Sequence, residues 1–259
     1  MLPSCHAAER NMNKVQILAH RGLVSEFVPE NTIKAFADAL HSGADVIETD
    51  VQCSSDGVAI IYHDEDLTRL AGIPKKVSEM SWKELSVLDI GFGKRIPTLK
   101  QALQEFPSSR FNLDIKSVGA IDATAAVINE LGAQRRVLIS SFSDSRRKRT
   151  LSKISGAIMT SAGSSRVLAL WLAAGLGASP LFRLIAQDIN AVQIPVKRFG
   201  FRFDTKNFVS MALAAGLEVH YWTINDLTQV IRLIKLGATG VVTDNCDLII
   251  SGLSKNNSE

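Results

Sequence analysis

The chain has 259 residues, of which 46% are hydrophobic and 21% are charged, and its formal net charge is +3 at pH 7. This length and hydrophobic content allow a substantial buried core, in one large α/β domain or in two smaller ones. The mild positive charge is spread through the sequence. It suits a small anionic substrate and argues against a nucleic-acid-binding protein.

The cysteines and the first residues bear on the cellular compartment. Cys5, Cys53 and Cys246 lie far apart without CxxC spacing, so neither a disulfide framework nor a zinc site is indicated. Reduced thiols predict a cytoplasmic location. Residues 1–11 lack the apolar segment of a secretory signal, and residues 1–12 are predicted to be a disordered leader.

Short β-branched runs alternate with helix-length segments along the rest of the chain. The predicted strands are 15–20, 45–51, 58–63, 110–115, 136–142, 156–161, 190–196, 217–222 and 240–244. Helical periodicity lies between them, for example at 31–42, 120–131, 205–216 and 225–237. Roughly eight strand–helix units predict one closed (β/α)₈ TIM barrel over residues 13–254. An open doubly wound sheet would need fewer strands and a glycine-rich phosphate loop, which the sequence lacks.

Residues 64–97 interrupt this rhythm after the second strand region. They carry one short helix signal, for which Ser81 is the predicted cap. Because long structureless loops are usually functional, we predict an insertion that overhangs the barrel mouth.

The most apolar stretch is residues 167–182. It is shorter than a membrane span and contains Gly175, Gly177 and Pro180, so it predicts a buried or surface helix that breaks near residue 177 and no transmembrane segment. The basic run RRKR at 146–149 is predicted to be solvated. Together with the apolar helix it gives a hint of peripheral membrane contact.

Polar side chains follow several predicted strands, where the mouth of a TIM barrel carries its active site. His20 and Arg21 end the first predicted strand, and His63 ends the one at 58–63. Glu48 and Asp50 are two residues apart, which places them on one face of their strand.

The strand predicted at 110–115 alternates between polar and apolar side chains. Its polar side chains are expected at the mouth and its apolar ones against the helices. The polar set is Asn112, Asp114 and Lys116, and the apolar set is Phe111, Leu113 and Ile115. His220 and Trp222 end a later strand in the same way, and Trp222 is expected to form a wall of the pocket.

The turn after the first strand contains several residues with special backbone preferences. Gly22 is expected to permit a tight change of chain direction after Arg21. Asn31 or Thr32 is the predicted cap of the first helix. Glu30 either supports the site or is a solvated acid in the first helical turn.

Three carboxylates, those of Glu48, Asp50 and Asp114, would repel one another if they were buried together without a cation. Oxygen ligands without a nearby cysteine favour Mg²⁺ or Ca²⁺. The alternative is that salt bridges with Arg21 and Lys116 neutralise the acids. Two cations would leave one negative charge unbalanced, so we predict a divalent metal site.

Two histidines beside such a metal can serve as general acid and base at phosphorus, because imidazole exchanges protons near neutral pH. These are His20 and His63. Arg21 can bind two phosphoryl oxygens and Lys116 a third, so the cluster predicts a phosphodiester site. The remaining histidines, His6 and His41, are expected to be surface or helix residues.

Several motifs resemble those of the glycerophosphodiester phosphodiesterase family in order and spacing, from about residue 15 to VVTD at 241–244. They are AHRG with PENT, ETDVQ, DGVAIIYHD, IPTL, NLDIK and YWTIND. The resemblance implies a TIM barrel with a small insertion, a divalent metal, and hydrolysis of glycerophosphodiesters to sn-glycerol 3-phosphate and an alcohol. The implied roles are acid and base for His20 and His63, phosphate ligand for Arg21, and metal ligands for Glu48, Asp50 and Asp114. It further implies that the glycerol hydroxyl attacks first and forms a cyclic phosphate.

One position departs from this family. A glutamate is usual where the chain has Asp114, and the shorter side chain withdraws the carboxylate from a metal. Two alternatives stay open: a phospholipase acting on intact lysolipid or sphingolipid, like the sphingomyelinase D enzymes, and a barrel that binds phosphodiesters without cleaving them. The preferred head group, the metal and the oligomeric state stay open as well.

Overall fold

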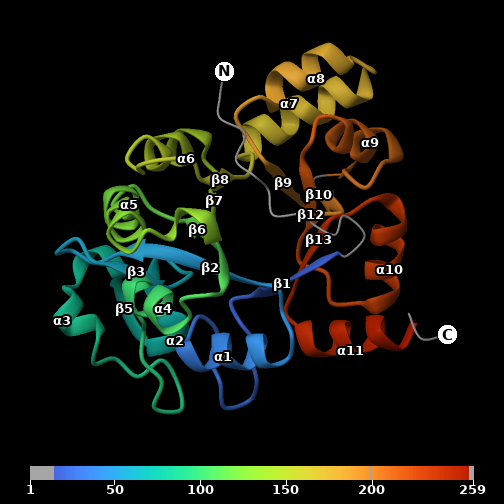
Figure 1. The fold of residues 1–259 in the computed structure, drawn as a ribbon. Coiled ribbons are helices and arrows are strands. Elements are labelled where there is room, and N and C mark those ends of the chain that lie inside the picture. The colour runs from blue at the N-terminus through green and yellow to red at the C-terminus, as the bar shows by residue number, and fades with distance from the viewer. Residues whose placement is uncertain (1–14, 199, 257–259) are drawn as a thin grey trace.

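The fold is seen in a computed structural model that describes residues 15–198 and 200–256. Figure 1 shows strands surrounded by helices. Within the described residues, eight strands run parallel to their neighbours. They are β1 (Gln16–His20), β2 (Val46–Cys53), β6 (Arg110–Ile115), β7 (Val137–Ser140), β8 (Met159–Thr160), β9 (Ala191–Ile194), β12 (Glu218–Tyr221) and β13 (Gly240–Thr243). The predicted leader, with Cys5 and His6, lies outside the described residues.

The sheet closes on itself. Its order is β8-β7-β6-β2-β1-β13-β12-β9, and a parallel bridge between Ser161 and Ala191 joins the two edges. The backbone N–H of Ala162 donates to the carbonyl of Ala191 at 2.9 Å across the same seam. The predicted TIM barrel is therefore confirmed.

Helices cover the outside of this barrel (Figure 1). They are α1 (Ile33–His41), α4 (Leu99–Glu105), α5 (Ala120–Leu131), η2 (Ala133–Arg136), α6 (Asp144–Leu151), α7 (Ser164–Gly175), α8 (Ser179–Ala186), α9 (Lys206–Ala214), α10 (Leu227–Leu236) and α11 (Cys246–Asn256). Thr32 is the cap of α1, since its hydroxyl accepts from the N–H of Ala35 at 3.2 Å. Phe36 of α1 packs edge-on against Phe111 of β6. Such contacts bury the apolar face of each helix against the barrel.

The segment predicted as a strand at 58–63 is not part of the barrel. Its ordered part, β3 (Ala59–Ile61), pairs antiparallel with β2. The turn between the two strands, residues 54–58, is too short for the crossover that a parallel neighbour requires. The prediction that His63 ends a barrel strand was wrong: His63 follows a hairpin strand that returns to the mouth.

Residues 64–97 are an ordered insertion. The elements there are β4 (Asp66–Leu67), α2 (Thr68–Ala71), β5 (Ile73–Lys76), η1 (Val77–Glu79) and α3 (Trp82–Leu85). Side chains such as Leu67, Val77 and Leu85 form a small separate core. Ser81 caps α3 as predicted, but the expectation of a structureless loop was wrong because scattered apolar residues meet only in three dimensions.

The apolar stretch breaks where predicted. α7 ends at Gly175, Gly177 adopts a left-handed backbone with φ of +66°, and α8 begins at Ser179. In the described ranges, no helix has the length and apolar character to cross a membrane. Figure 1 shows α7 and α8 as a pair on the outside of the barrel.

The basic run at 146–149 is not uniformly solvated, contrary to the prediction. The side chain of Arg147 is fully buried. Its Nε lies 3.0 Å from Oδ1 of Asp144, and its Nη2 lies 3.6 Å from Oδ2 of Asp188. Arg147 therefore ties α6 to the segment after α8, whereas Lys148 and Arg149 are exposed.

Replacing Arg147 by Met is expected to lower the free energy of unfolding by about 3 kcal/mol, because Asp144 loses its buried charge partner. Denaturant unfolding of the variant measures this loss. Arg149→Met on the same helix is the matched control and should unfold like the wild type. Equal behaviour of the two variants would show that the buried pair contributes no stability.

Candidate functional site

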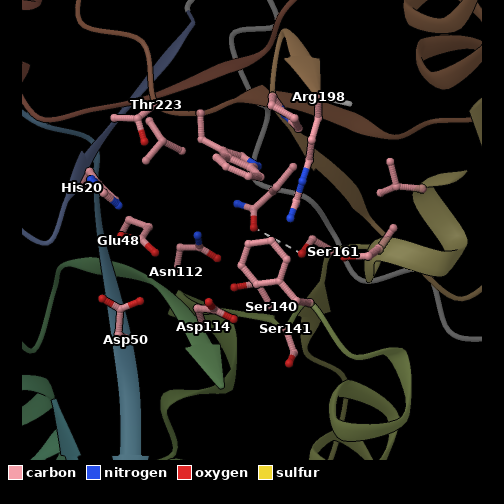
Figure 2. Close-up of a pocket in the computed structure, with 18 of the residues that line it drawn as sticks. His20, Glu48, Asp50, Asn112, Asp114, Ser140, Ser141, Ser161, Arg198 and Thr223 are labelled. Carbon is pink, nitrogen blue, oxygen red and sulfur yellow. Dashed lines mark hydrogen bonds between the residues drawn. The ribbon is translucent and has the colours of Figure 1, made fainter. Parts of the chain in front are cut away.

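A cavity of about 550 Å³ lies at the mouth of the barrel. It collects side chains from the turn after β1, from β2 and β6, and from later strand ends. Every site residue predicted from the sequence lines it: His20, Arg21, Glu48, Asp50, His63, Asp114, Lys116 and Trp222. Figure 2 shows the acidic side chains at one end of this pocket, with Arg198 and Ser161 at the other.

The turn after β1 is held in a tight conformation. Arg21 has φ of 60°, and its N–H donates to the carbonyl of Glu48 at 2.9 Å. Gly22 has φ of +87°, and a Cβ there would come within 2.7 Å of Ala35. Only glycine fits such a close approach. The turn thereby directs Arg21 toward the acidic residues on β2.

Asp50 has several positively polarised partners. Nζ of Lys116 lies 2.9 Å from its Oδ1, Nε of Arg21 lies 3.2 Å from its Oδ2, and Nδ2 of Asn31 donates to Oδ2 at 3.0 Å. Burial raises the pKa of Asp50, but the charges of Lys116 and Arg21 outweigh it and hold this pKa below its usual value. Lys116 also lies 2.8 Å from Oδ2 of Asp114.

Glu48 is in the opposite electrostatic situation. Burial, with a further contribution from the charge of Asp50, raises the pKa of Glu48 to about 7. Its Oε2 is buried without a hydrogen-bond partner, and so is Oδ1 of Asn112. Burial also raises the pKa of Asp114, although Lys116 offsets part of the effect.

The salt bridges that the sequence left as an alternative are thus present, but they do not satisfy the whole cluster. Among residues 15–198 and 200–256, no three His, Cys, Asp or Glu side chains converge closely enough to hold a metal as they stand. The cluster still offers only oxygen donors, two of them buried and unpartnered. This donor chemistry fits a hard cation such as Mg²⁺ or Ca²⁺.

A carboxylate orients His20. Nδ1 of His20 donates to Oδ1 of Asp244 at 2.6 Å, and Asn225 donates to the other oxygen of Asp244 at 2.7 Å. Burial alone would lower the pKa of His20, but the hydrogen bond to Asp244 and the charge of Glu48 raise it above 6.5. With Nδ1 engaged, Nε2 is the nitrogen left to face a substrate.

His63 is held in a similar way by a chain of ion pairs. Its Nδ1 donates to Oδ1 of Asp64 at 2.6 Å, and Asp64 also pairs with Nε of Arg69 at 2.6 Å. Arg69 makes two hydrogen bonds to Glu30, at 2.7 and 3.0 Å. Glu30 in turn accepts from Arg21 at 2.9 Å. Glu30 therefore supports the site, and this series of ion pairs connects His63 to Arg21.

None of residues 64–97 lines the cavity, so the prediction that the insertion overhangs the barrel mouth was wrong. The insertion instead contacts the site through Asp64 and Arg69. These ion pairs place it beside the pocket, where it holds His63 and Glu30.

The wall opposite the acids is largely apolar. Its residues are Phe142, Val167, Leu168, Pro195, Phe201, Phe203 and Trp222. The rings of Phe142 and Trp222 meet edge-on at 5.8 Å, and the guanidinium of Arg198 lies 5.8 Å from the ring centre of Phe142. Trp222 is thus a pocket wall, as predicted.

One predicted mouth residue lies elsewhere. His220 is 1% exposed and does not line the cavity, and its Nε2 is 3.1 Å from Oε2 of Glu218. His220 and Trp222 share a strand face, but His220 lies one layer deeper inside the barrel. Its expected place at the mouth was therefore wrong.

The sequence interpretation missed four orienting residues: Asn31, Asp64, Arg69 and Asp244. Asp244 directly follows β13, the neighbour of β1, so the rule that assigns strand ends to the mouth could have found it. Asn31 was considered only as a helix cap. Nothing in the sequence signals that Arg69 reaches Glu30.

Comparison with known proteins gives the same picture. The sequence pattern of the glycerophosphoryl diester phosphodiesterase family matches residues 20–248. The chain belongs to this family. It is 37% identical over 232 residues to a probable glycerophosphodiester phosphodiesterase 2 of Mycobacterium tuberculosis, covering 90% of this chain and 88% of that protein. The family and the activity class predicted from the motifs, a phosphoric diester hydrolase, are both confirmed.

Other members of the glycerophosphoryl diester phosphodiesterase family are more distant. A phosphodiesterase from Oleispira antarctica, solved in complex with the product sn-glycerol-3-phosphate, has a TM-score of 0.73 and 25% identity over 92% of this chain and 96% of that one. A human lysophospholipase D is 26% identical over 88% of this chain and 82% of its own length.

Replacing Asp244 by Asn is expected to lower the pKa of His20, because a neutral amide no longer stabilises the protonated ring. In the wild type the raised pKa makes the protonated pair stabilising below pH 6.5, and this stability is lost as the pH rises through the folded-state pKa. The difference in unfolding free energy between the wild type and Asp244→Asn should therefore shrink as the pH rises from 6.5 through the folded-state pKa of His20.

An NMR titration of the His20 ring in metal-free protein measures the pKa directly. The exposed Asp122, which pairs with Lys153, provides the control Asp122→Asn. An unchanged His20 pKa in Asp244→Asn would show that this carboxylate does not control the imidazole.

Proposed function

We propose that the chain is a metal-dependent glycerophosphodiesterase that forms sn-glycerol 3-phosphate and an alcohol, with His20 and His63 as acid and base. The observation that carries this proposal is the pairing of each imidazole Nδ1 with its own carboxylate in one pocket. Such pairing fixes the ring and leaves Nε2 to exchange a proton with the substrate. The Oleispira antarctica relative, which was solved with sn-glycerol-3-phosphate, supports the product.

The charged residues around the histidines have distinct roles in this proposal. Arg21 and Lys116 bind phosphoryl oxygens and offset their negative charge. Glu48, Asp50 and Asp114 would hold the divalent ion by closing around it, since they do not converge far enough as they stand. The unpartnered oxygen of Glu48 favours this arrangement. When bound, Mg²⁺ or Ca²⁺ stabilises negative charge on the phosphoryl group. His20 and His63 exchange the roles of acid and base between ring closure to the cyclic phosphate and its opening by water.

The apolar wall supports a second candidate substrate. Phe142, Leu168 and Phe201 flank the space beyond the acidic end, where a further part of the substrate would extend. Such a wall favours a substrate whose glycerol part carries a hydrocarbon chain, as in a lysophospholipid. The human lysophospholipase D relative points in the same direction. Both candidates use the same cleavage chemistry and release the same head-group alcohol. They differ in the acyl chain on the glycerol that remains attached to the phosphate.

Purified protein is expected to release glycerol 3-phosphate from glycerophosphocholine when Mg²⁺ or Ca²⁺ is present and to stop when EDTA is added. A panel that includes lysophosphatidylcholine distinguishes the two substrate classes. Product analysis by chromatography measures each rate. Full activity in EDTA would contradict the metal assignment, and inactivity toward every phosphodiester would leave only the non-catalytic barrel.

Metal binding can be measured without turnover. Isothermal titration calorimetry should detect a divalent ion in the wild type and at least tenfold weaker binding in Glu48→Gln, because the neutral amide loses a charged ligand. The exposed Glu130 provides the control Glu130→Gln, which should bind like the wild type. Equal affinity in all three proteins would place the ion elsewhere.

His20→Ala and His63→Ala are each expected to lower kcat at least about a hundredfold, because each removes a proton-transfer group. Binding of glycerol 3-phosphate should persist in both variants. His41→Ala, on the last turn of α1, is the matched control. Near wild-type turnover in either pocket variant would exclude that histidine from the acid–base pair.

A further inference from the structure

An exposed apolar stripe follows α7 away from the pocket. Leu168, Leu172 and Leu176 recur at four-residue spacing, which places them on one side of the helix, and they are 48%, 51% and 81% exposed. The opposite side of α7 is buried and includes Leu170 and Ala173. Leu168 also lines the substrate cavity. The stripe therefore begins in the pocket wall and continues to the end of the helix.

A basic hairpin packs beside this stripe. It consists of β10 (Lys197–Arg198) and β11 (Phe201–Arg202), which pair antiparallel. Trp171 of α7 donates its indole N–H to the carbonyl of Arg202 at 2.8 Å, and its ring lies 5.0 Å from that of Phe201. The side chains of all four paired hairpin residues are exposed. Arg198 reaches the pocket as well, as Figure 2 shows.

Exposed leucines bordered by cations suit an anionic lipid surface better than they suit water. The leucines can enter the boundary between head groups and acyl chains, while Lys197 and Arg198 lie against the head-group phosphates. A second copy of the chain fits less well. A symmetric contact over the stripe would bring two copies of the same basic hairpin together.

We propose that α7 and the β10–β11 hairpin form a docking surface for anionic phospholipid membranes beside the pocket mouth. This surface would hold the protein at the place where lipid-derived phosphodiesters arise. It goes beyond the proposed hydrolysis, because binding to vesicles does not require turnover. A protein without hydrolytic activity could still be tested for vesicle binding, and a protein that binds no vesicles could still be tested for hydrolysis.

The test is sedimentation with vesicles of phosphatidylcholine alone or mixed in equal amounts with phosphatidylglycerol. The wild type should bind the mixed vesicles and release them as salt is raised. The double variant Leu172→Ser and Leu176→Ser should bind at least about tenfold more weakly, because two apolar side chains no longer enter the lipid. Lys197→Glu should weaken binding to the mixed vesicles. None of these three residues lines the cavity.

Leu248→Ser is the matched control. Leu248 is a 66% exposed leucine on α11, which Figure 1 shows on the opposite side of the barrel from α7. Unchanged hydrolysis of a soluble substrate and an unchanged circular dichroism spectrum would show that the variants are folded. The proposal is overturned if the wild type binds neither vesicle, or if the double variant binds as tightly as the wild type. It is equally overturned if ultracentrifugation shows a dimer that the double variant dissociates while vesicle binding is absent.

Discussion

The burial of three carboxylates at one end of a closed barrel is the constraint on which the site depends. Glu48, Asp50 and Asp114 are each less than a tenth exposed, so little water remains to solvate their charge. Lys116 lies between Asp50 and Asp114 and compensates both. Glu48 has no such partner, and its pKa rises accordingly. The buried acids at the mouth therefore outnumber the cations that pair with them, and the divalent ion that we propose would offset this excess of negative charge.

Around this cluster, a second set of carboxylates fixes the two histidines that we propose as acid and base. Asp244 and Asp64 each hold one histidine through Nδ1, so the two rings present the same nitrogen to the pocket. The anchors come from distant parts of the chain, one after β13 and one after the β2–β3 hairpin. Barrel closure brings them to one mouth. The geometry of the histidines is thus a property of the whole fold and not of either local turn.

Much of this arrangement follows from local sequence rules. The repeated strand–helix pattern determines the barrel, and the alternation in β6 places Asp114 and Lys116 at the mouth because side chains in a strand point to opposite faces in turn. Other features depend on tertiary contacts that a single sequence does not reveal. The antiparallel direction of β3 follows from the short turn that precedes it. The depth of His220 follows from the layers of side chains inside the barrel. The burial of Arg147 depends on a partner 41 residues away in the sequence.

The double hydrogen bond between Arg69 and Glu30 has a consequence for how this scaffold can diverge. Arg69 belongs to the insertion, whereas Glu30 belongs to the loop that follows β1. A chimera that received residues 64–97 from a relative would receive the relative's partner in place of Arg69 but keep Glu30. The Arg69–Glu30 clamp would then be matched only if the loop after β1 were exchanged as well. The insertion and that loop therefore form a single exchangeable module, although more than 30 residues of sequence and a barrel strand separate their clamp residues.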